Sequence, residues 1–123
     1  MKKNPVLDAL KKASKGLLFM SETDATLEPF LWAGGGDVTK ENVLKHAGVE
    51  DETPAEETTL DSFFRVVPRE DRPKFEKLLK VLREQLAGAK VYKLGEEPEK
   101  PVYVVGKTPD GKLAGVKTTV VET

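Results

Sequence analysis

Apolar residues recur at helical spacing near the start of this chain and again in its second half. The first helix is predicted between Asn4, a good N-cap, and Gly16, which supplies a left-handed stop. The clearest helix opens at Asp71 and ends at Gly88. Their apolar stripes are Val6, Leu7, Leu10 and Ala13 in the first helix, and Phe75, Leu78, Leu79, Leu82 and Leu86 in the second.

Shorter elements are predicted between these helices. Leu27–Trp32 is typical of a strand, and Pro29 favours either an edge position or the start of the strand. The triple glycine that follows is interpreted as a flexible turn, because it lacks the Lys-Ser/Thr of a phosphate loop. A short helix then begins at a cap formed by Asp37 or Thr39 and is closed by Gly48.

Two neighbouring segments contrast sharply in polarity. Glu50–Glu57 carries five carboxylates and no large apolar side chain, which predicts a solvated loop. Leu60–Val67 contains two phenylalanines and must reach the core, either as a strand or as a helix.

The last third of the chain is rich in β-branched residues. Val91–Leu94, Val102–Val105 and Leu113–Val121 are predicted strands, and a turn over 108–111 joins the last two. In the final strand, one side is expected to carry Ala114, Val116, Thr118 and Val120.

This final strand continues to the end of the chain without a Gly, Pro or Ser tail. A sheet that holds the terminus would fix the positions of Glu122 and Thr123. Such a rigid group of oxygens is suited to a partner's metal ion or to a cationic pocket; alternatively, it is only a strand end. Together these elements predict an α+β fold with at least three helices on a mainly antiparallel sheet.

Length and composition limit the number of domains and the kinds of site that this chain can form. With 123 residues, 38% of them hydrophobic, the chain is expected to form one domain over residues 1–123. It has no cysteine and therefore no disulfide, thiol nucleophile or zinc–thiolate site. No apolar run approaches the roughly 18 residues that span a bilayer, and lysines interrupt any signal-peptide pattern. We therefore expect a cytoplasmic protein.

The net charge of −1 conceals an uneven distribution along the chain. Residues 1–20 carry a net charge of +4, residues 21–61 carry −9, and residues 62–123 carry +4. This split favours an acidic face suited to a basic partner. The alternative is that the segments interleave in space and their fields average out.

Candidate chemistry is sparse. The one histidine, His46, is interpreted as a surface or helix-end residue, because no second His and no Cys can complete a site with it. The sequence therefore gives no positive sign of an enzyme. Glu22 stands out more, because it lies two residues after the apolar run Leu17–Met20, and burial of that run would fix the backbone of Glu22. An acid in such a polar turn, over 21–24, is otherwise a capping or solvated residue.

Three stretches together resemble the nuclease A inhibitor family. They are Ala13–Glu22 with Phe30–Trp32; Asp61–Phe64; and the end of the chain, over 91–96, 102–106, 108–111, 113–115 and 120–123. The resemblance implies a three-layer α/β/α sandwich of the plant pathogenesis-related type. It also implies a one-to-one protein inhibitor of a Mg²⁺-dependent, sugar-non-specific DNA/RNA endonuclease with a ββα-metal active site.

The resemblance also implies the contact residues. In the family, the terminal threonine reaches the catalytic metal of the nuclease and the glutamate of the Phe-Met-Ser-Glu run contacts the active site; these positions match Thr123 and Glu22. Mg²⁺ prefers oxygen ligands, and a cleft that holds phosphates is cationic. Glu122 and Asp24, the acidic neighbours of these two residues, complete the predicted contact set. The inhibitor itself is expected to need no cofactor, to bind neither nucleic acid nor a membrane, and to be a monomer when free.

One departure from the family lies between Phe64 and the long helix. There a family member carries a longer insertion with a tryptophan that contacts the nuclease, whereas this chain has only the stretch Arg65–Arg72. Its sole tryptophan, Trp32, is in a scaffold position of the family. The anchor is therefore missing or replaced, with Arg69 and Arg72 as candidates. The alternative function is a non-catalytic binding module of the same fold whose partner is not a nuclease.

Overall fold

The computed structural model describes residues 5–20, 24–50, 52–65, 67–96 and 98–121. The helices in these ranges are α1 (Pro5–Ser14), α2 (Lys40–Ala47), α3 (Leu60–Phe64) and α4 (Arg72–Gln85). The strands are β1 (Leu18–Met20), β2 (Asp24–Thr26), β3 (Glu28–Gly35), β4 (Ala55–Thr58), β5 (Ala87–Leu94), β6 (Glu99–Lys107) and β7 (Lys112–Val121). Within the described ranges, no helix combines the length and apolar character that crossing a membrane requires.

The strands form a five-stranded sheet in the order β3-β7-β6-β5-β4 and a separate pair, β1-β2. Every pairing is antiparallel. The predicted α+β class with a mainly antiparallel sheet is therefore confirmed. β3, the strand that contains Pro29, lies at an edge of the sheet as predicted. β7 is hydrogen-bonded on both sides, to β3 and to β6.

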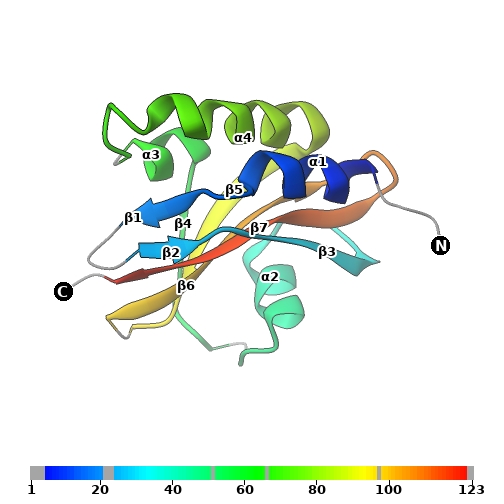
Figure 1. The fold of residues 1–123 in the computed structure, drawn as a ribbon. Helices are drawn as coiled ribbons and strands as arrows, with labels where there is room; N and C mark the ends of the chain where they lie inside the picture. The colour runs from blue at the N-terminus through cyan, green and yellow to red at the C-terminus, as the bar shows by residue number, and fades with distance from the viewer. Residues whose placement is uncertain (1–4, 21–23, 51, 66, 97, 122–123) are drawn as a thin grey trace.

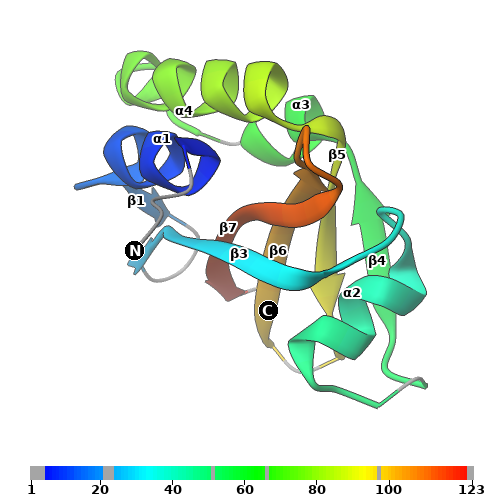
Figure 2. The ribbon, with the colours of Figure 1, turned by 90° about the vertical axis from the view of Figure 1, so that its right-hand side faces the viewer.

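Helices cover both faces of the five-stranded sheet. α1, α3 and α4 lie over one face, and α2 lies over the other (Figures 1 and 2). The final strand shows the predicted alternation, because Ala114, Val116 and Val120 join the apolar cluster under α1, α3 and α4. Leu113 joins the second cluster, with Val43 and Leu44 of α2. β7 thus separates two cores, which fixes its register strongly.

The ends of the helices follow local signals in the sequence. α1 ends just before Gly16, which has φ 78°, and α2 ends at Gly48, which has φ 75°. Of the two predicted caps, Thr39 is the N-cap of α2, since its side chain accepts a hydrogen bond from the Asn42 N–H at 3.2 Å. The segment Leu60–Val67 forms helix α3 and the turn after it. Its buried residues are Leu60, Phe63, Phe64 and Val67.

The prediction of a solvated loop over Glu50–Glu57 is wrong at its end. β4 begins at Ala55 and pairs with β5 in the register Glu56↔Lys93 and Glu57↔Tyr92. Exposed edge strands bury few side chains, so this strand lacks the apolar alternation that would have revealed it. β4 is held by its backbone hydrogen bonds to β5 and by the opposite charges of Glu56 and Lys93, which take the place of apolar burial.

The prediction that Gly88 ends the long helix is also wrong. α4 ends at Gln85, and Leu86 is already extended with φ −124°. Leu86 stays buried, so the chain leaves the helix without leaving the core. Gly88, with φ 60°, lies inside β5, where the register against β6 shifts between Ala87 and Lys90. A glycine at such an irregularity is typical of a β-bulge.

Two smaller differences concern the first half of the chain. The predicted polar turn over 21–24 ends earlier, because Asp24 is the first residue of β2 and pairs with Met20. The triple glycine is not entirely a turn, since Gly34 and Gly35 belong to β3, after a register shift that follows Trp32.

Candidate functional site

Three of the four predicted contact residues, Glu22, Glu122 and Thr123, lie outside the described residues. The fourth, Asp24, is the first residue of β2. The structure therefore describes the scaffold that leads to the predicted contacts, namely the β1–β2 hairpin and the end of β7.

The hairpin is anchored by an aromatic contact. Phe19 of β1 is buried and stacks on Phe63 of α3, with ring centroids 4.5 Å apart and planes at 6°. It also meets Phe64 edge-on at 6.0 Å. Leu17 and Leu27, which flank the hairpin, are buried as well. Both strands that lead to the connection over 21–23 are therefore fixed against the core.

The end of β7 is anchored along the sheet. Val120 is 3% exposed, and β6 pairs with β7 as far as Lys100↔Val120 and Glu99↔Val121. This pairing reaches the last described residue, Val121, two positions before the end of the chain. As the sequence predicted, the strand is part of the sheet up to this point.

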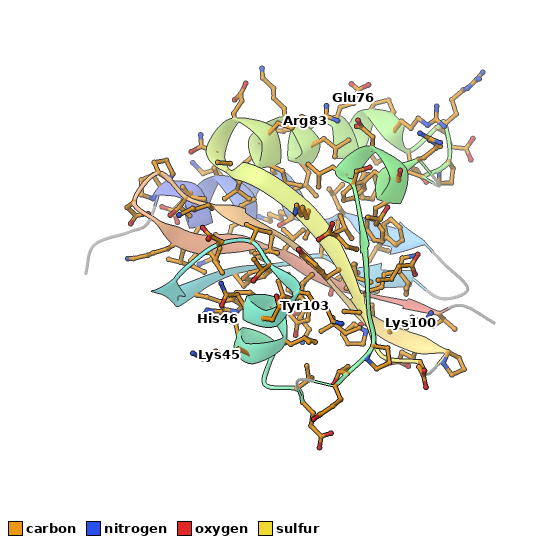
Figure 3. All side chains as sticks on the ribbon, turned by 180° about the vertical axis from the view of Figure 1, so that it is seen from behind. Lys45, His46, Glu76, Arg83, Lys100 and Tyr103 are labelled. Atoms are coloured by element: carbon orange, nitrogen blue, oxygen red, sulfur yellow. The ribbon has the colours of Figure 1, made fainter. Side chains whose placement is uncertain are left out.

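The two anchored scaffolds lie at the same end of the molecule. In Figure 1 the end of β1, the start of β2 and the end of β7 all lie on the left. Lys100, at the start of β6, also lies at this end (Figure 3). Segments separated by about a hundred residues in sequence therefore approach one another here. The sequence pattern alone could not bring them together, because their proximity depends on the sheet order.

Of the candidate replacements for the missing tryptophan, Arg69 lies in the connection between α3 and α4, and Arg72 is the first residue of α4. Arg72 donates from Nε to the carbonyl oxygen of Val67 at 3.3 Å. It lines a hollow of about 270 Å³ together with Phe64 and Phe75. Arg69 is exposed in the connection before α4. Arg72 therefore has a structural role in closing the turn that precedes α4.

The acidic segment over 21–61 is partly interleaved with basic residues from later in the chain. Among the described residues, ion pairs join acids of this segment to bases of the last one, as in Asp37 with Lys107, Glu57 with Lys90, and Asp61 with Arg83. At these positions the alternative of interleaved charges is correct. Other acids of the segment, such as Glu50, Glu52 and Glu56, are exposed.

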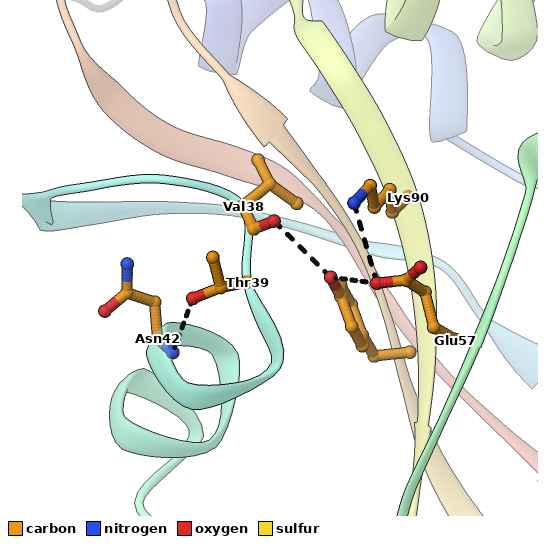
Figure 4. A network of polar contacts seen from close by, with 6 residues as sticks. Val38, Thr39, Asn42, Glu57 and Lys90 are labelled. Atoms are coloured by element: carbon orange, nitrogen blue, oxygen red, sulfur yellow. Dashed lines mark hydrogen bonds and ion pairs between the residues drawn. The ribbon is translucent and has the colours of Figure 1, made fainter.

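One polar network ties β4 to the rest of the fold (Figure 4). The buried Tyr92 donates from its hydroxyl to Glu57 Oε1 at 2.7 Å, and that hydroxyl lies 3.5 Å from the carbonyl oxygen of Val38. Lys90 Nζ lies 3.6 Å from the same carboxylate oxygen. Burial, together with the hydrogen bond to Glu57 and the negative charges of Glu57 and Glu41, raises the pKa of Tyr92 well above its usual range.

His46 lies near the end of α2, as the sequence predicted (Figure 3). Its ring stacks on Trp32, with centroids 4.8 Å apart and planes at 8°. Trp32 also contacts Phe30 and Tyr103, so it belongs to the core on the α2 side. In the described ranges, no group of three His, Asp or Glu residues could hold a metal ion.

One surface residue was missed by the sequence reasoning. The apolar run Leu17–Met20 was expected to be buried, but Leu18 is 46% exposed. Leu18 pairs with Thr26 across the hairpin, on the face opposite to Phe19. An uninterrupted apolar run does not show which of its residues faces outward, so strand alternation was the only available signal.

Comparison with known proteins adds one finding. Residues 4–123 match the family described as nuclease A inhibitor-like protein. The match covers nearly the whole chain, including the hairpin and the final strand. Among curated proteins, none matches this chain.

Proposed function

The chain belongs to the nuclease A inhibitor-like family, and we propose that it blocks the active site of a Mg²⁺-dependent, sugar-non-specific DNA/RNA endonuclease as a one-to-one protein inhibitor. Membership of this family indicates a role in nuclease inhibition in general. The family is an inhibitor family, which suggests that the chain acts by binding and not by catalysis. The nuclease, its metal and the contact residues are the finer parts of this proposal.

The observation that carries the proposal is the convergence of two anchored scaffolds. The β1–β2 hairpin and the end of β7 approach the same end of the molecule (Figure 1), and each leads directly to a predicted contact residue. Glu22 and Thr123 would act together on one partner surface. Thr123 would supply oxygen ligands to the Mg²⁺ of the partner, and Glu22 would occupy a subsite that otherwise holds phosphate.

Anionic oxygens on a rigid frame suit this task for two reasons. They can fill open positions of a hard metal ion without offering a bond that the nuclease could cleave. Oxygens whose positions are set before binding would also lose little conformational entropy when the complex forms. Asp24 and Glu122 would add negative charge beside the two contacts. An acidic surface at this end would also speed the encounter with a cationic cleft, and salt would weaken that effect.

The remaining parts of the proposal concern the fold and the setting. Helices on both faces of the sheet support the three-layer α/β/α sandwich of the plant pathogenesis-related type that the resemblance implies. The free inhibitor would be a cytoplasmic monomer that holds no cofactor. Its interface with the nuclease would bury about 1,200–2,000 Å² in total.

Two alterations at the contact end test this proposal. Glu22→Ala should weaken inhibition of such a nuclease, whereas Glu76→Ala, which removes the same charge from the exposed side of α4 (Figure 3), should not. An extension appended after Thr123 should weaken inhibition, whereas the same extension before Met1 should not. A C-terminally extended protein that inhibits as well as the unextended one would refute the role of Thr123.

The alternative, a binding module with a partner other than a nuclease, draws support from one observation. The connection between α3 and α4 is short and contains no tryptophan, so the additional contact that the resemblance implies is missing or replaced here. Full nuclease activity at a large excess of this protein, for several Mg²⁺-dependent non-specific nucleases, would favour this alternative.

A further inference from the structure

The surface around Leu18 is apolar and hollowed. Leu18 is the one large hydrophobic residue exposed in the described part of the chain, at 46%. It lies between two open hollows, one of about 470 Å³ that also touches Thr26 and Pro29, and one of about 170 Å³ that also touches Phe75. We call Leu18 and these two hollows the Leu18 surface.

Lysines border this surface. Lys11 and Lys15, at the end of α1, line the larger hollow and are exposed. Neither forms an ion pair with any residue in the described ranges. Lys74 borders the smaller hollow; its ammonium group lies 3.5 Å from Asp71 and its side chain is 68% exposed. Asp71 also lines the smaller hollow and balances Lys74, whereas the lining of the larger hollow contains Lys11 and Lys15 and no carboxylate. The larger hollow is therefore complementary to an apolar side chain with carboxylates beside it.

The Leu18 surface adjoins the proposed contact end. Leu18 precedes Met20, the last residue of β1, by two positions, a distance of about 7 Å along a strand. A partner that covers about 800 Å² of this protein would extend well beyond the connection over 21–23. The Leu18 surface therefore lies within reach of the same partner.

We propose that the Leu18 surface is a second contact for the target nuclease, which inserts an apolar side chain flanked by carboxylates between Lys11, Lys15 and Leu18. This inference rests on the proposed function. The cationic cleft of the nuclease would receive the acidic contact end, and an acidic rim of the same nuclease would meet the lysines. Alternating charges of this kind fix the orientation of a complex and disfavour wrong partners.

Lysines at the end of a helix also favour the helix dipole, which explains why Lys11 and Lys15 suit α1 without any partner. That explanation does not account for the exposed Leu18 or for the hollows on both of its sides. Lysines at a solvated helix end require neither an exposed leucine nor hollows beside it.

The test measures inhibition of a Mg²⁺-dependent non-specific nuclease by the full-length protein and by two variants. Leu18→Asp puts a carboxylate where an apolar contact is proposed. The double change Lys11→Glu, Lys15→Glu reverses the charge of the two lysines that border the larger hollow. The matched control is Lys77→Glu, Lys80→Glu, which makes the same change of charge on exposed positions of α4. We expect both surface variants to raise the inhibition constant about tenfold or more, and the control to change it less than about threefold. Reversing the lysines removes favourable charges from the end of α1, and Leu18 is only 46% exposed, so each surface variant should lower the Tm by a few degrees. Each should still unfold in one cooperative transition well above the temperature of the inhibition assay.

The possible outcomes separate this inference from the proposed function. If the wild type inhibits and both surface variants inhibit equally well, the second contact is wrong and the proposed function stands. If the wild type does not inhibit at a large excess, the proposed function fails and this inference fails with it. Sedimentation of the wild type as a dimer that Leu18→Asp dissociates would assign the surface to a second copy, and loss of DNA binding on reversing the lysines would assign it to nucleic acid. Either result would overturn the inference.

Discussion

Replacing Tyr92 with phenylalanine is the sharpest structural test of how the acidic strand β4 is held. The tyrosine is fully buried on β5 and donates to Glu57 on β4, across the pair Glu57↔Tyr92 (Figure 4). Phenylalanine keeps the ring and removes only the hydroxyl. Tyr103 offers a matched control, because it lies directly opposite Tyr92 on β6 and its hydroxyl makes no hydrogen bond to the described part of the chain.

The expected loss follows from the surroundings of the bond. A hydrogen bond to a charged group contributes about 1.5–3 kcal/mol, and a neutral one about 1 kcal/mol. The Glu57 side chain is 52% exposed and keeps Lys90 nearby at 3.6 Å, so water and the ammonium group would compensate for part of the loss. We expect Tyr92→Phe to lower the free energy of unfolding by about 1–1.5 kcal/mol, and Tyr103→Phe to change it by less than about 0.5 kcal/mol. For a domain of this size the loss corresponds to a decrease in Tm of about 3–6 °C.

The same variant should alter the dependence of stability on pH. Because the pKa of Tyr92 is raised in the folded protein, its contribution is fully present below pH 10.0, the usual pKa of tyrosine, and is lost as the pH rises above that value. Urea unfolding at several pH values from 8 to 11 measures this. By pH 11 the stability advantage of the wild type over Tyr92→Phe should shrink by about 1 kcal/mol or more.

Equal stability of the two phenylalanine variants at pH 8 would refute the reasoning about the Glu57 bond. A stability difference that stays constant from pH 8 to 11 would refute the assignment of a raised pKa to Tyr92. Inhibition of the nuclease should be unaffected by Tyr92→Phe, because the contact end lies outside this network.

Three further predictions concern the scaffold. Gly115→Ala should cost about 3 kcal/mol or more in urea unfolding, because the added Cβ would overlap the carbonyl of Val104, whereas Gly48→Ala should cost about 1–2 kcal/mol from its positive φ alone. Arg83→Ala should change the Tm by only a few degrees, since the ion pair with Asp61 is exposed and such pairs contribute about 0–1 kcal/mol; a larger loss would reveal a packing role. Phe19→Ala should cost about 3–5 kcal/mol and weaken inhibition as well, because the stack on α3 anchors the hairpin; unchanged inhibition by the still-folded variant would contradict that role.

The sequence predicted the longer helices and strands that bury a regular face, and it missed the exposed strand β4 and the short strands β1 and β2. β7 was correctly predicted because its alternating residues separate two cores, so the pattern is strong. β4 was missed because an exposed edge strand of Ala55–Thr58 shows no such alternation. The end of α4 was misplaced because the burial of Leu86 continues the apolar spacing after the helix has ended.

For the candidate site, the sequence pattern predicted the supporting strand, and only the family resemblance predicted the contact residues. Periodicity indicated that β7 continues to the end of the chain, and the structure confirms its pairing as far as Val121. The roles of Glu22 and Thr123 came from resemblance to a family, because a contact residue is defined by its partner and not by the packing of its own chain. The exposure of Leu18 could not be separated from the burial of its neighbours, since all belong to one apolar run.

The most direct measurement of the central claim is a titration of a Mg²⁺-dependent, sugar-non-specific nuclease with this protein, unextended at its C-terminus. We predict that DNA and RNA cleavage disappear together at one equivalent of protein. An equal amount of protein extended after Thr123 should leave much of the activity. Unchanged cleavage at a large excess of the unextended protein, against several such nucleases, would contradict the account.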